Sequence, residues 1–470
     1  MAKKKETDKE LMYERHYFWK NASSNEQKAA MDFAEGYKKF LDDCKTEREA
    51  IDTTIELLKD KGFKEILTNK KSKKVFATFR GKSVAFAILG KKPVSDGVNV
   101  VGSHVDAPRI DLKQNPFYED GSTGMGMMRT HYYGGIKKYQ WVSTPLALHG
   151  VVVKKDGSVV KISIGEDASE PVFCIPDLLP HLARKEQYSK TMGEAVSASN
   201  LNMIFSGMVG PDKKEKKAIK MFALRILKEK YDITESDFIS AELEIVPAGK
   251  ARDCGIDRSF VMGYGQDDRI CAYTSLMALL DGKGTPEKTA IIYFADKEEI
   301  GSVGNTGASS IFLKDFIGDL LIQNGEECTD YILRKTLIKT NMLSADVSAG
   351  INPNYPSVHE KQNAPMIGYG VSVSKFTGSG GKGGSNDANA EYTAKVLGIF
   401  SDDKIHWQMG ELGNVDVGGG GTIAYILARD GAEVIDCGTP LLGMHSLYEM
   451  CSKADLYSTY RAYKAFIEKA

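Results

Sequence analysis

The chain has 470 residues, of which 42% are hydrophobic and 27% are charged, so its composition is that of a globular protein with roughly two to four domain-sized units. Its formal net charge of -1 gives no electrostatic attraction to nucleic acid or to an anionic membrane, and we expect neither as a partner. No apolar run approaches the ~18 residues that a membrane helix needs, and no apolar signal segment follows the basic residues 1–6.

The seven cysteines are widely spaced and include no Cys-x-x-Cys pair. An odd count without paired spacing is typical of reduced, buried thiols, so it predicts a cytoplasmic protein. The same spacing disfavours a structural zinc site made of thiolates. No cysteine stands in a recognisable nucleophile motif with a histidine partner, which disfavours hydrolysis by a thiol.

The first part of the chain predicts helices followed by strands. Residues from about 8 to 60 are rich in helix formers, and Ile51, Ile55 and Leu58 recur at helical spacing. Three apolar runs of β type come next, at 75–79, 84–89 and 98–102.

The segment 109–253 has a different sequence pattern, in which turn residues interrupt runs of aromatic and β-branched residues. Residues 151–160 predict a β-hairpin that turns at Asp156-Gly157. The Lys-rich stretch 212–217 predicts a surface loop or the start of a helix. We therefore expect a mostly β domain here.

From residue 255 the alternation of strand, turn and helix returns. A helix is expected from about Asp268 to Gly282, and Ser446 to Glu449 form a capping-box pattern that predicts the start of a C-terminal helix. Further strands are expected at 290–295, 342–347 and 432–437. The simplest organisation is an α/β domain made of residues 1–108 and 254–470, with residues 109–253 inserted between its halves.

One biased segment, 377–386, is rich in glycine. It fails the P-loop pattern because Gly383, and not serine or threonine, follows Gly381-Lys382. We expect a flexible or tightly turning loop.

His104 and Asp106 stand just after the apolar run 98–102. Side chains two residues apart on an extended chain point to the same side, so Asp106 could hold the second ring nitrogen of a metal-bound His104. The alternative interpretation is a surface histidine beside a turn aspartate.

Asp267 and Asp268 come directly before the helix that is expected from Asp268. Asp268 could cap this helix and leave Asp267 free, or the pair could serve the cap alone. A free carboxylate can bridge two cations with its two oxygens, which a neutral imidazole cannot do.

Glu298 and Glu299 follow the apolar run 290–295. The carboxyl ends of parallel strands are where α/β folds bind ligands. Two neighbouring glutamates there could divide the work, one as a metal ligand and the other as a base, although Glu-Glu pairs are also common on solvated surfaces.

Asp346 and His445 complete the set of candidates. Asp346 stands at the end of the run 342–347, where a lone aspartate is usually a turn residue. His445 stands immediately before the capping-box pattern, and a lone histidine is more often structural than a ligand.

Together these positions offer two histidines, two aspartates and one glutamate as ligands, with one glutamate to spare. Oxygen-rich ligation with one imidazole per ion suits two divalent cations, zinc in the first place, with manganese or cobalt as alternatives. Two such ions share a water and lower its pKa, so that a bridging hydroxide exists near neutral pH, and the spare glutamate moves the proton to the leaving amine. This chemistry predicts a hydrolase of amide bonds.

At these residues the chain resembles the family of dinuclear zinc aminopeptidases that contains aspartyl aminopeptidase and vacuolar aminopeptidase I. The resemblance covers nearly the whole chain and rests on five ordered motifs: Ser103 to Asp106, Asp267-Asp268, Glu298 to Ser302, Ser344 to Asp346 with Pro353-Asn354-Tyr355, and Met444 to Glu449.

The resemblance implies the fold and the role of each candidate. The fold would be a three-layer α/β/α mixed-sheet metallopeptidase domain with an inserted, mostly β oligomerisation domain. Asp267 would bridge the ions, His104 and Asp346 would complete one site, and Glu299 and His445 would complete the other. The resemblance also implies that Glu298 is the general base, that Asp106 supports catalysis, and that the Asp267-Asp268 peptide bond is cis.

The family also implies an assembly and a substrate. Twelve copies would form a tetrahedral dodecamer, and short peptides with an acidic or a leucine-like N-terminal residue would be the substrates. His181 resembles a family residue that reaches the active site of a neighbouring subunit. Lys375 resembles a family lysine that lies near the side chain of the substrate.

Two other functions fit parts of the pattern. A metal-dependent carboxypeptidase or deacylase uses a similar ligand set but does not demand a free amine on its substrate. A binding or scaffold protein could keep the fold, although the complete ligand set argues against it.

Overall fold

The computed structural model describes residues 11–212 and 214–470 of the chain. The basic residues 1–6, the residues 8–10 of the expected first helical region and one position of the Lys-rich stretch 212–217 lie outside the described residues. Within the described ranges, no helix is both long enough and apolar enough to cross a membrane.

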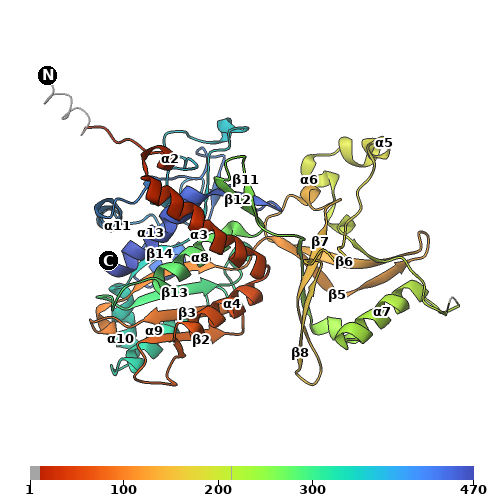
Figure 1. Ribbon diagram of the computed structural model, residues 1–470, viewed down its shortest axis with the longest axis horizontal. Coiled ribbons are helices and arrows are strands. Elements are labelled where there is room, and N and C mark those ends of the chain that lie inside the picture. The colour runs from red at the N-terminus through yellow and green to blue at the C-terminus, as the bar shows by residue number, and fades with distance from the viewer. Residues whose placement is uncertain (1–10, 213) are drawn as a thin grey trace.

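The central sheet has nine strands in the described part of the chain and confirms the expected mixed α/β architecture (Figure 1). Its strand order is β1-β2-β3-β13-β4-β14-β20-β16-β18. The neighbours β13, β4, β14 and β20 run parallel, whereas β3 and β16 pair with them in the antiparallel direction. The strands are Lys64–Glu65 (β1), Lys74–Phe79 (β2), Ser83–Ile88 (β3), Asn99–His104 (β4), Ala290–Ala295 (β13), Asn341–Ser344 (β14), Val371–Ser374 (β16), Trp407–Met409 (β18) and Glu433–Gly438 (β20).

Helices cover both faces of this sheet because its inner strands are apolar on both sides. Along β13, Ile292 and Phe294 pack on one face, while Ile291 and Tyr293 pack on the other. The first face is covered by Ser24–Asp43 (α3), Glu47–Asp60 (α4), Gln266–Leu280 (α8), Ala390–Asp402 (α11) and Lys453–Lys469 (α13). The second face is covered by Phe312–Gln323 (α9), Asp330–Ile338 (α10) and Ala424–Ala428 (α12). The expected three-layer arrangement is therefore confirmed.

The expected capping box at Ser446 to Glu449 is wrong. Glu449 begins the strand Glu449–Ser452 (β22), and α13 starts only at Lys453, with Ser452 as its N-cap. The physical reason is that the carboxylate of Glu449 accepts hydrogen bonds from the backbone of residues 267 and 445, so it does not serve the helix. The strand expected at 342–347 also ends early, at Ser344.

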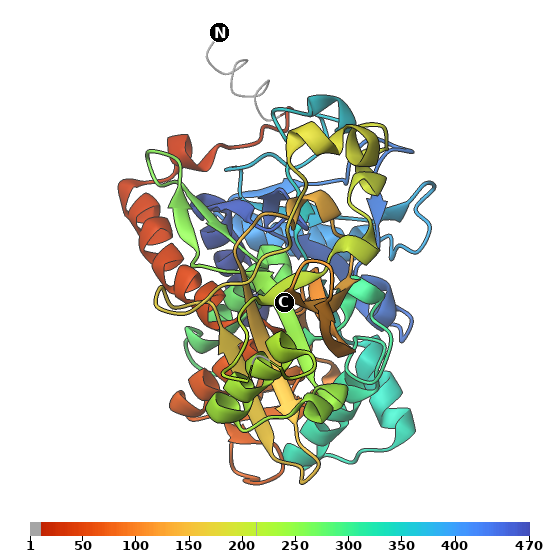
Figure 2. The same ribbon diagram turned by 90° about the vertical axis from the view of Figure 1, so that its right-hand side faces the viewer.

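A second sheet, with six strands in the described residues, projects from the side of the central body in Figure 1 and faces the viewer in Figure 2. All its pairs are antiparallel, in the order β8-β7-β10-β5-β6-β9, and the β7–β8 pair is the expected hairpin. The helix Ala218–Tyr231 (α7) packs on it through Leu227. The strands are Arg109–Asp120 (β5), Met125–Tyr133 (β6), Leu146–Val153 (β7), Val159–Ile164 (β8), Met203–Ser206 (β9) and Glu242–Pro247 (β10).

A third sheet connects segments that are far apart in the sequence. Its order is β11-β12-β22-β21-β15, and β12 pairs with β22 so that Gly263 lies opposite Glu449. This pairing brings the residues that follow β12 close to the turn that precedes β22. The strands are Arg252–Cys254 (β11), Phe260–Gly263 (β12), Ser348–Ala349 (β15) and Pro440–Leu442 (β21), together with β22.

Ion pairs around the buried Glu47 join the six-stranded sheet to α4. The guanidinium of Arg109 lies 3.5 Å from the carboxylate of Glu47 in α4 and 3.1 Å from that of Glu244 in β10. Lys82 lies 3.2 Å from Glu47 and 3.0 Å from Glu242. Removing one partner of such a network leaves an uncompensated buried charge, which typically costs about 3–5 kcal/mol.

His149 in β7 is part of the same interface. One ring nitrogen lies 2.8 Å from Oε1 of Glu49 in α4, and the other lies 3.1 Å from Oε1 of Glu166. Burial lowers the pKa of His149, but the hydrogen bonds to Glu166 and Glu49 outweigh burial and raise the pKa to about 9. The imidazolium form therefore links the sheet to α4 near neutral pH.

We predict that His149→Gln destabilises the protein in a pH-dependent way. Because the pKa of His149 is higher in the folded than in the unfolded chain, its contribution is fully present below about pH 6.5 and is lost as the pH rises through about 9. Thermal unfolding at about pH 6 should show the variant less stable by up to about 3 kcal/mol, and at about pH 9.5 the two midpoints should approach each other. The exposed His131 of the same sheet supplies the control, His131→Gln; a gap that does not depend on pH would contradict the prediction.

Candidate metal centre

Most of the predicted ligands lie at the carboxyl edge of the central sheet. His104 is the last residue of β4, which lies between β13 and β14 and runs parallel to both. The pair Glu298 and Glu299 forms a 3₁₀ turn a few residues after β13, and Asp346 follows two residues after β14. Because three adjacent parallel strands end at the same edge, their following residues meet there.

Asp267 and His445 reach the same place from the five-stranded sheet. Asp267 stands in the first turn of α8, shortly after β12, and its peptide bond to Asp268 is cis, as expected. His445 lies in the turn between β21 and β22. The pairing of β12 with β22 explains why these two residues, 178 positions apart by number, become neighbours.

The carboxylate of Asp267 lies between the two imidazoles. Its Oδ1 is 3.1 Å from Nε2 of His104, and its Oδ2 is 3.2 Å from Nε2 of His445. Nε2 of His445 lies 3.4 Å from Oε1 of Glu299, and Nε2 of His104 lies 3.9 Å from Oδ1 of Asp346. Each imidazole thus faces one oxygen of Asp267 and at least one further carboxylate.

Both imidazoles are held by backbone carbonyl groups on their far side. Nδ1 of His104 lies 3.0 Å from the carbonyl oxygen of Asp106, and Nδ1 of His445 lies 3.0 Å from the carbonyl oxygen of Gly135. A carbonyl can only accept a hydrogen bond, so Nδ1 carries the proton in each ring. Nε2 is then left as the metal-binding nitrogen, as in most protein zinc sites with a supported histidine.

The donor atoms fit zinc. Two ligands that are each about 2.0–2.1 Å from a tetrahedral zinc lie roughly 3.3 Å apart. The distances from Asp267 to the two imidazoles, 3.1 and 3.2 Å, and from His445 to Glu299, 3.4 Å, are close to this value, and the distance from His104 to Asp346 is wider, at 3.9 Å. Oε1 of Glu299 is buried and has no hydrogen-bond partner, although a carboxylate oxygen at such a place needs a donor or a cation. Glu298 also lies within reach, with Oε2 4.0 Å from Nε2 of His104.

Raised pKa values favour the protonated form of three carboxylates of the cluster, but not of Asp267. Burial raises the pKa of Glu298 to about 7 and raises the pKa values of Glu299 and Asp346 well above their ordinary range. Burial also raises the pKa of Asp267, but hydrogen bonds to His104 and His445 outweigh it and hold that pKa well below its usual value.

Burial acts on the pKa values of the imidazoles in the opposite direction, but their net pKa values are raised as well. Burial lowers the pKa of His104, but hydrogen bonds to Asp106 and Asp267 outweigh burial and raise it well above its ordinary value. Burial likewise lowers the pKa of His445, and the hydrogen bond to Asp267 reverses this effect and raises the pKa to about 10. Protons therefore supply the positive charge that the cluster demands, and metal binding would release them.

Asp106 supports the glutamate turn as well as His104. Its Oδ1 accepts a hydrogen bond from the backbone N–H of Glu298 at 3.1 Å, and its Oδ2 accepts one from that of Glu299 at 3.2 Å. Oδ1 also lies 3.3 Å from Nδ1 of His104. One buried carboxylate therefore fixes both a ligand and the turn that carries the predicted base.

Glu449 is a supporting residue that the sequence interpretation assigned to a helix cap. Its Oε2 accepts from the backbone N–H of Asp267 at 3.0 Å, and its Oε1 accepts from that of His445 at 2.8 Å. Burial raises the pKa of Glu449 to about 8. The sequence did mark Glu449, because the motif that begins at Met444 ends at this residue. The distant backbone group that Glu449 contacts, however, cannot be predicted from local spacing.

A cavity of about 240 Å³ opens beside the cluster. Among the described residues, its lining includes Phe376, Leu412, Met444 and Glu411 but neither lysine nor arginine. Of the glycine-rich segment 377–386, only Thr377 lines the cavity, and the lining glycines are Gly419, Gly420 and Gly421. The segment itself makes a tight turn, as expected, in which Ser379 and Gly383 bond through their backbones. The cavity thus offers a polar cluster on one side and apolar side chains on the other.

Two predicted site residues are not brought to the cluster within this chain. Lys375 is 40% exposed and its Nζ lies 2.9 Å from Oδ1 of Asp387; Lys375 does not line the cavity, although Ser374 and Phe376 do. His181 is exposed in the short helix Pro180–Ala183 (α5), which belongs to the segment between β8 and β9. The roles expected for both residues stay predictions.

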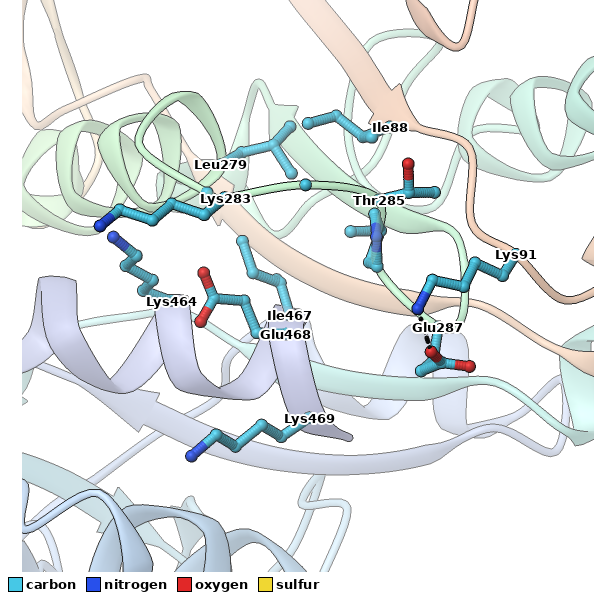
Figure 3. Close-up of a pocket in the computed structure, with 14 residues that line it drawn as sticks. Ile88, Lys91, Leu279, Lys283, Thr285, Glu287, Lys464, Ile467, Glu468 and Lys469 are labelled. Atoms are coloured by element: carbon cyan, nitrogen blue, oxygen red, sulfur yellow. Dashed lines mark hydrogen bonds and ion pairs between the residues drawn. The ribbon is translucent and has the colours of Figure 1, made fainter.

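A different cavity, of about 410 Å³, lies near the opposite edge of the central sheet (Figure 3). It is bordered by the last residue of β3 and the first residue of β13, Ile88 and Ala290. Lysines and glutamates line it, among them the ion pair of Lys91 with Glu287, but its lining includes neither imidazole nor thiol among the described residues. The metal-type donors therefore belong to the first cavity.

The chain is similar to known proteins in both sequence and fold. Residues 40–467 match the family described as "Aminopeptidase I zinc metalloprotease (M18)". The "Probable M18 family aminopeptidase 1" of Clostridium acetobutylicum is 48% identical over 468 residues, with 97% of this chain and 99% of the relative covered. The crystal structure of an M18-family aminopeptidase from Thermotoga maritima has a TM-score of 0.92 at 43% identity and covers 98% of this chain and 100% of its own. A structure described as the S. cerevisiae mApe1 dodecamer shares the fold, with a TM-score of 0.75 at 23% identity and coverage of 95% and 97%.

Proposed function

The chain belongs to the M18 family of aminopeptidase I zinc metalloproteases and is an aminopeptidase, and we propose that it uses two metal ions to remove N-terminal residues from short peptides. The observation that carries the proposal is the position of Asp267, whose two oxygens face two different imidazoles. A carboxylate in this position is suited to bridge two cations.

In this proposal each ion has its own ligands besides Asp267. His104 and Asp346 would hold one ion, and Glu299 and His445 would hold the other. Zinc is the expected metal, with cobalt or manganese as alternatives that suit the same donors. Two zinc ions bound there would supply Lewis acidity, polarising the scissile carbonyl group and lowering the pKa of the attacking water.

Glu298 is proposed as the general base. Glu298 is the one carboxylate of the cluster that is not assigned as a ligand of either ion. Burial raises its pKa to about 7, and a general base works best when its pKa lies near the working pH. Its carboxylate would take the proton from the attacking water and deliver it to the nitrogen of the leaving amine. Asp106 would keep this carboxylate in place through the backbone of the glutamate turn.

We predict that Glu298→Gln binds the metal as the wild type does but loses most of its turnover. The amide keeps the shape of the side chain but cannot accept the proton, and such a loss is typically about 10²- to 10⁴-fold in kcat. Zinc content by elemental analysis and kcat on leucyl amides measure the two effects. The control is Glu327→Gln, at an exposed position. Near-normal turnover of the Glu298 variant would contradict the proposed role of Glu298 as general base.

The lining of the cavity favours a neutral, leucine-like N-terminal residue over an acidic one. Phe376, Leu412 and Met444 offer apolar contacts, and the carboxylate of Glu411 would repel an acidic side chain. Lys375 could favour an acidic residue only by leaving Asp387 and turning toward the cavity. Glu411 is therefore proposed to exclude acidic substrates.

We predict that kcat/KM is highest for leucyl and methionyl amides and that Glu411→Gln raises kcat/KM for glutamyl amides. Removing a like charge near the substrate should give about a fivefold to tenfold gain, corresponding to about 1–1.4 kcal/mol, with little effect on leucyl amides. N-acetylated peptides should not be cleaved, which distinguishes an aminopeptidase from a deacylase. Glu391→Gln, on the exposed start of α11, is the control, and a wild-type preference for glutamyl amides would contradict the assignment.

We also propose that residues 109–253 form an inserted oligomerisation domain and that the chain assembles as a dodecamer. The segment 178–192 exposes five large apolar side chains, each between 42% and 68% exposed: Leu178, Leu179, Leu182, Tyr188 and Met192. A patch of this kind on a water-soluble surface is typical of an interface. His181 lies in the same segment, which is where a residue acting on a neighbouring subunit would be expected. The cysteine pattern supports a cytoplasmic location.

We predict that Leu182→Glu breaks the assembly. Light scattering should give about 620 kDa for twelve copies of the 51.6 kDa wild-type chain and a much smaller mass for the variant, because a buried charge opposes association. Ile338→Glu in α10 of the central body, with an exposed apolar side chain of similar kind, is the control. A monomeric wild type at working concentration would refute the proposal.

A further inference from the structure

We infer that the turn Tyr133-Gly134-Gly135, at the end of β6, positions both halves of the metal centre. This turn begins with the last residue of β6 in the six-stranded sheet, whereas the proposed ligands lie in or next to strands of the central and five-stranded sheets. The inference rests on the proposed function, because the turn acts through the residues assigned there as ligands and base. It adds residues that do not themselves touch substrate or metal but fix the groups that do.

Tyr133 reaches the half of the site that contains the glutamate turn. Its hydroxyl donates a hydrogen bond to Oδ2 of Asp106 at 2.9 Å. This oxygen also accepts from the backbone N–H of Glu299, while the other oxygen of Asp106 accepts from that of Glu298. Three donors from two sheets therefore converge on one buried carboxylate, so the orientation of the glutamate turn depends on Tyr133.

The ring of Tyr133 is itself fixed from behind. The guanidinium of Arg109 lies 3.8 Å from the ring centre, and Arg109 and Tyr133 are paired in register on β5 and β6. Arg109 is held in turn by the carboxylates of Glu47 and Glu244. The hydroxyl is thus presented to Asp106 by a rigid, buried support.

Gly135 reaches the other half of the site. Its carbonyl oxygen accepts the hydrogen bond from Nδ1 of His445 at 3.0 Å. This bond selects the ring form that leaves Nε2 free, and Nε2 faces Asp267 and Glu299. A backbone carbonyl two residues beyond β6 therefore sets the direction in which His445 can bind a metal.

The two glycines allow this close approach. A Cβ atom on Gly134 would lie 3.3 Å from Cβ of Glu299, and the φ of Gly134 is +70°, where other residues are strained. A Cβ atom on Gly135 would lie 3.2 Å from Nδ1 of His445. Any side chain at either position would press on a proposed ligand.

If Tyr133 positions the metal centre, its substitution should change kcat and zinc affinity, which a purely structural role would not require. Tyr133→Phe keeps the ring against Arg109 but removes the hydrogen bond to Asp106. Loss of a supporting hydrogen bond of this kind typically costs about 10- to 100-fold in metal affinity or activity. We expect kcat to fall about tenfold while KM stays within about twofold, and zinc affinity to fall about tenfold in competition with a chelator.

Gly135→Ala tests the second half of the site. Pressure of the new methyl group on His445 should weaken zinc binding at one of two sites, so that chelator titration shows one ion leaving about tenfold more readily than in the wild type. The matched controls lie in the same β5–β6 hairpin. Tyr132→Phe alters the exposed neighbour of Tyr133, and Gly121→Ala adds a methyl group where no atom lies within 4 Å. Both controls should behave as the wild type.

The outcomes separate this inference from the function on which it rests. A wild type that binds zinc and cleaves leucyl amides, with Tyr133→Phe and Gly135→Ala matching it in zinc affinity and kcat, would overturn the inference alone. A wild type that binds no zinc would overturn the proposed function and the inference together. If Gly135→Ala fails to fold by circular dichroism, Tyr133→Phe decides, because it removes a single oxygen atom and keeps the ring.

Discussion

The rest of this structure depends on a cluster of four carboxylates and two imidazoles that face one another. The charge of these carboxylates must be compensated. Negative charge that is removed from water is costly unless positive charge lies beside it. Asp267 has the shortest separations in the cluster, 3.1 and 3.2 Å to the two imidazoles, and so marks the place where this charge is most concentrated. Protons can supply part of the compensation, as the raised pKa values of Glu298 and His445 show, and divalent cations can supply it more completely.

The fold brings the charged groups together because several chain segments meet at the carboxyl edge of the central sheet. Adjacent parallel strands deliver His104, the glutamate turn and Asp346, whereas the β12–β22 pairing delivers Asp267 and His445. A surrounding set of hydrogen-bond acceptors, which includes the carboxylate of Glu449 and the backbone of the Tyr133-Gly135 turn, then fixes the orientation of each group. The ion pairs around Glu47 hold the six-stranded sheet in the position from which that turn reaches the site.

Much of this could be predicted from the sequence because the signals are local. An apolar run or a tight turn followed by a ligand-type side chain selected all five candidate ligands: His104, Asp267, Glu299, Asp346 and His445. The resemblance to a family then suggested which of them share an ion. The supporting groups could not be found in this way. Every residue has a backbone carbonyl oxygen, so the sequence does not show that the carbonyl of Gly135 supports a ligand. The glycine itself looks in the sequence like any other turn glycine. Glu449 was assigned to a helix cap because its true partners are backbone groups, one of them 182 positions away.

The most direct test of the central claim is a crystal structure of the zinc-loaded protein with anomalous data at the zinc absorption edge. The account predicts two anomalous peaks, one on each side of the Asp267 carboxylate, with Nε2 of His104 bound to one ion and Nε2 of His445 bound to the other. A single peak, or two peaks that leave Asp267 unbound, would contradict the claim that this one side chain organises the site.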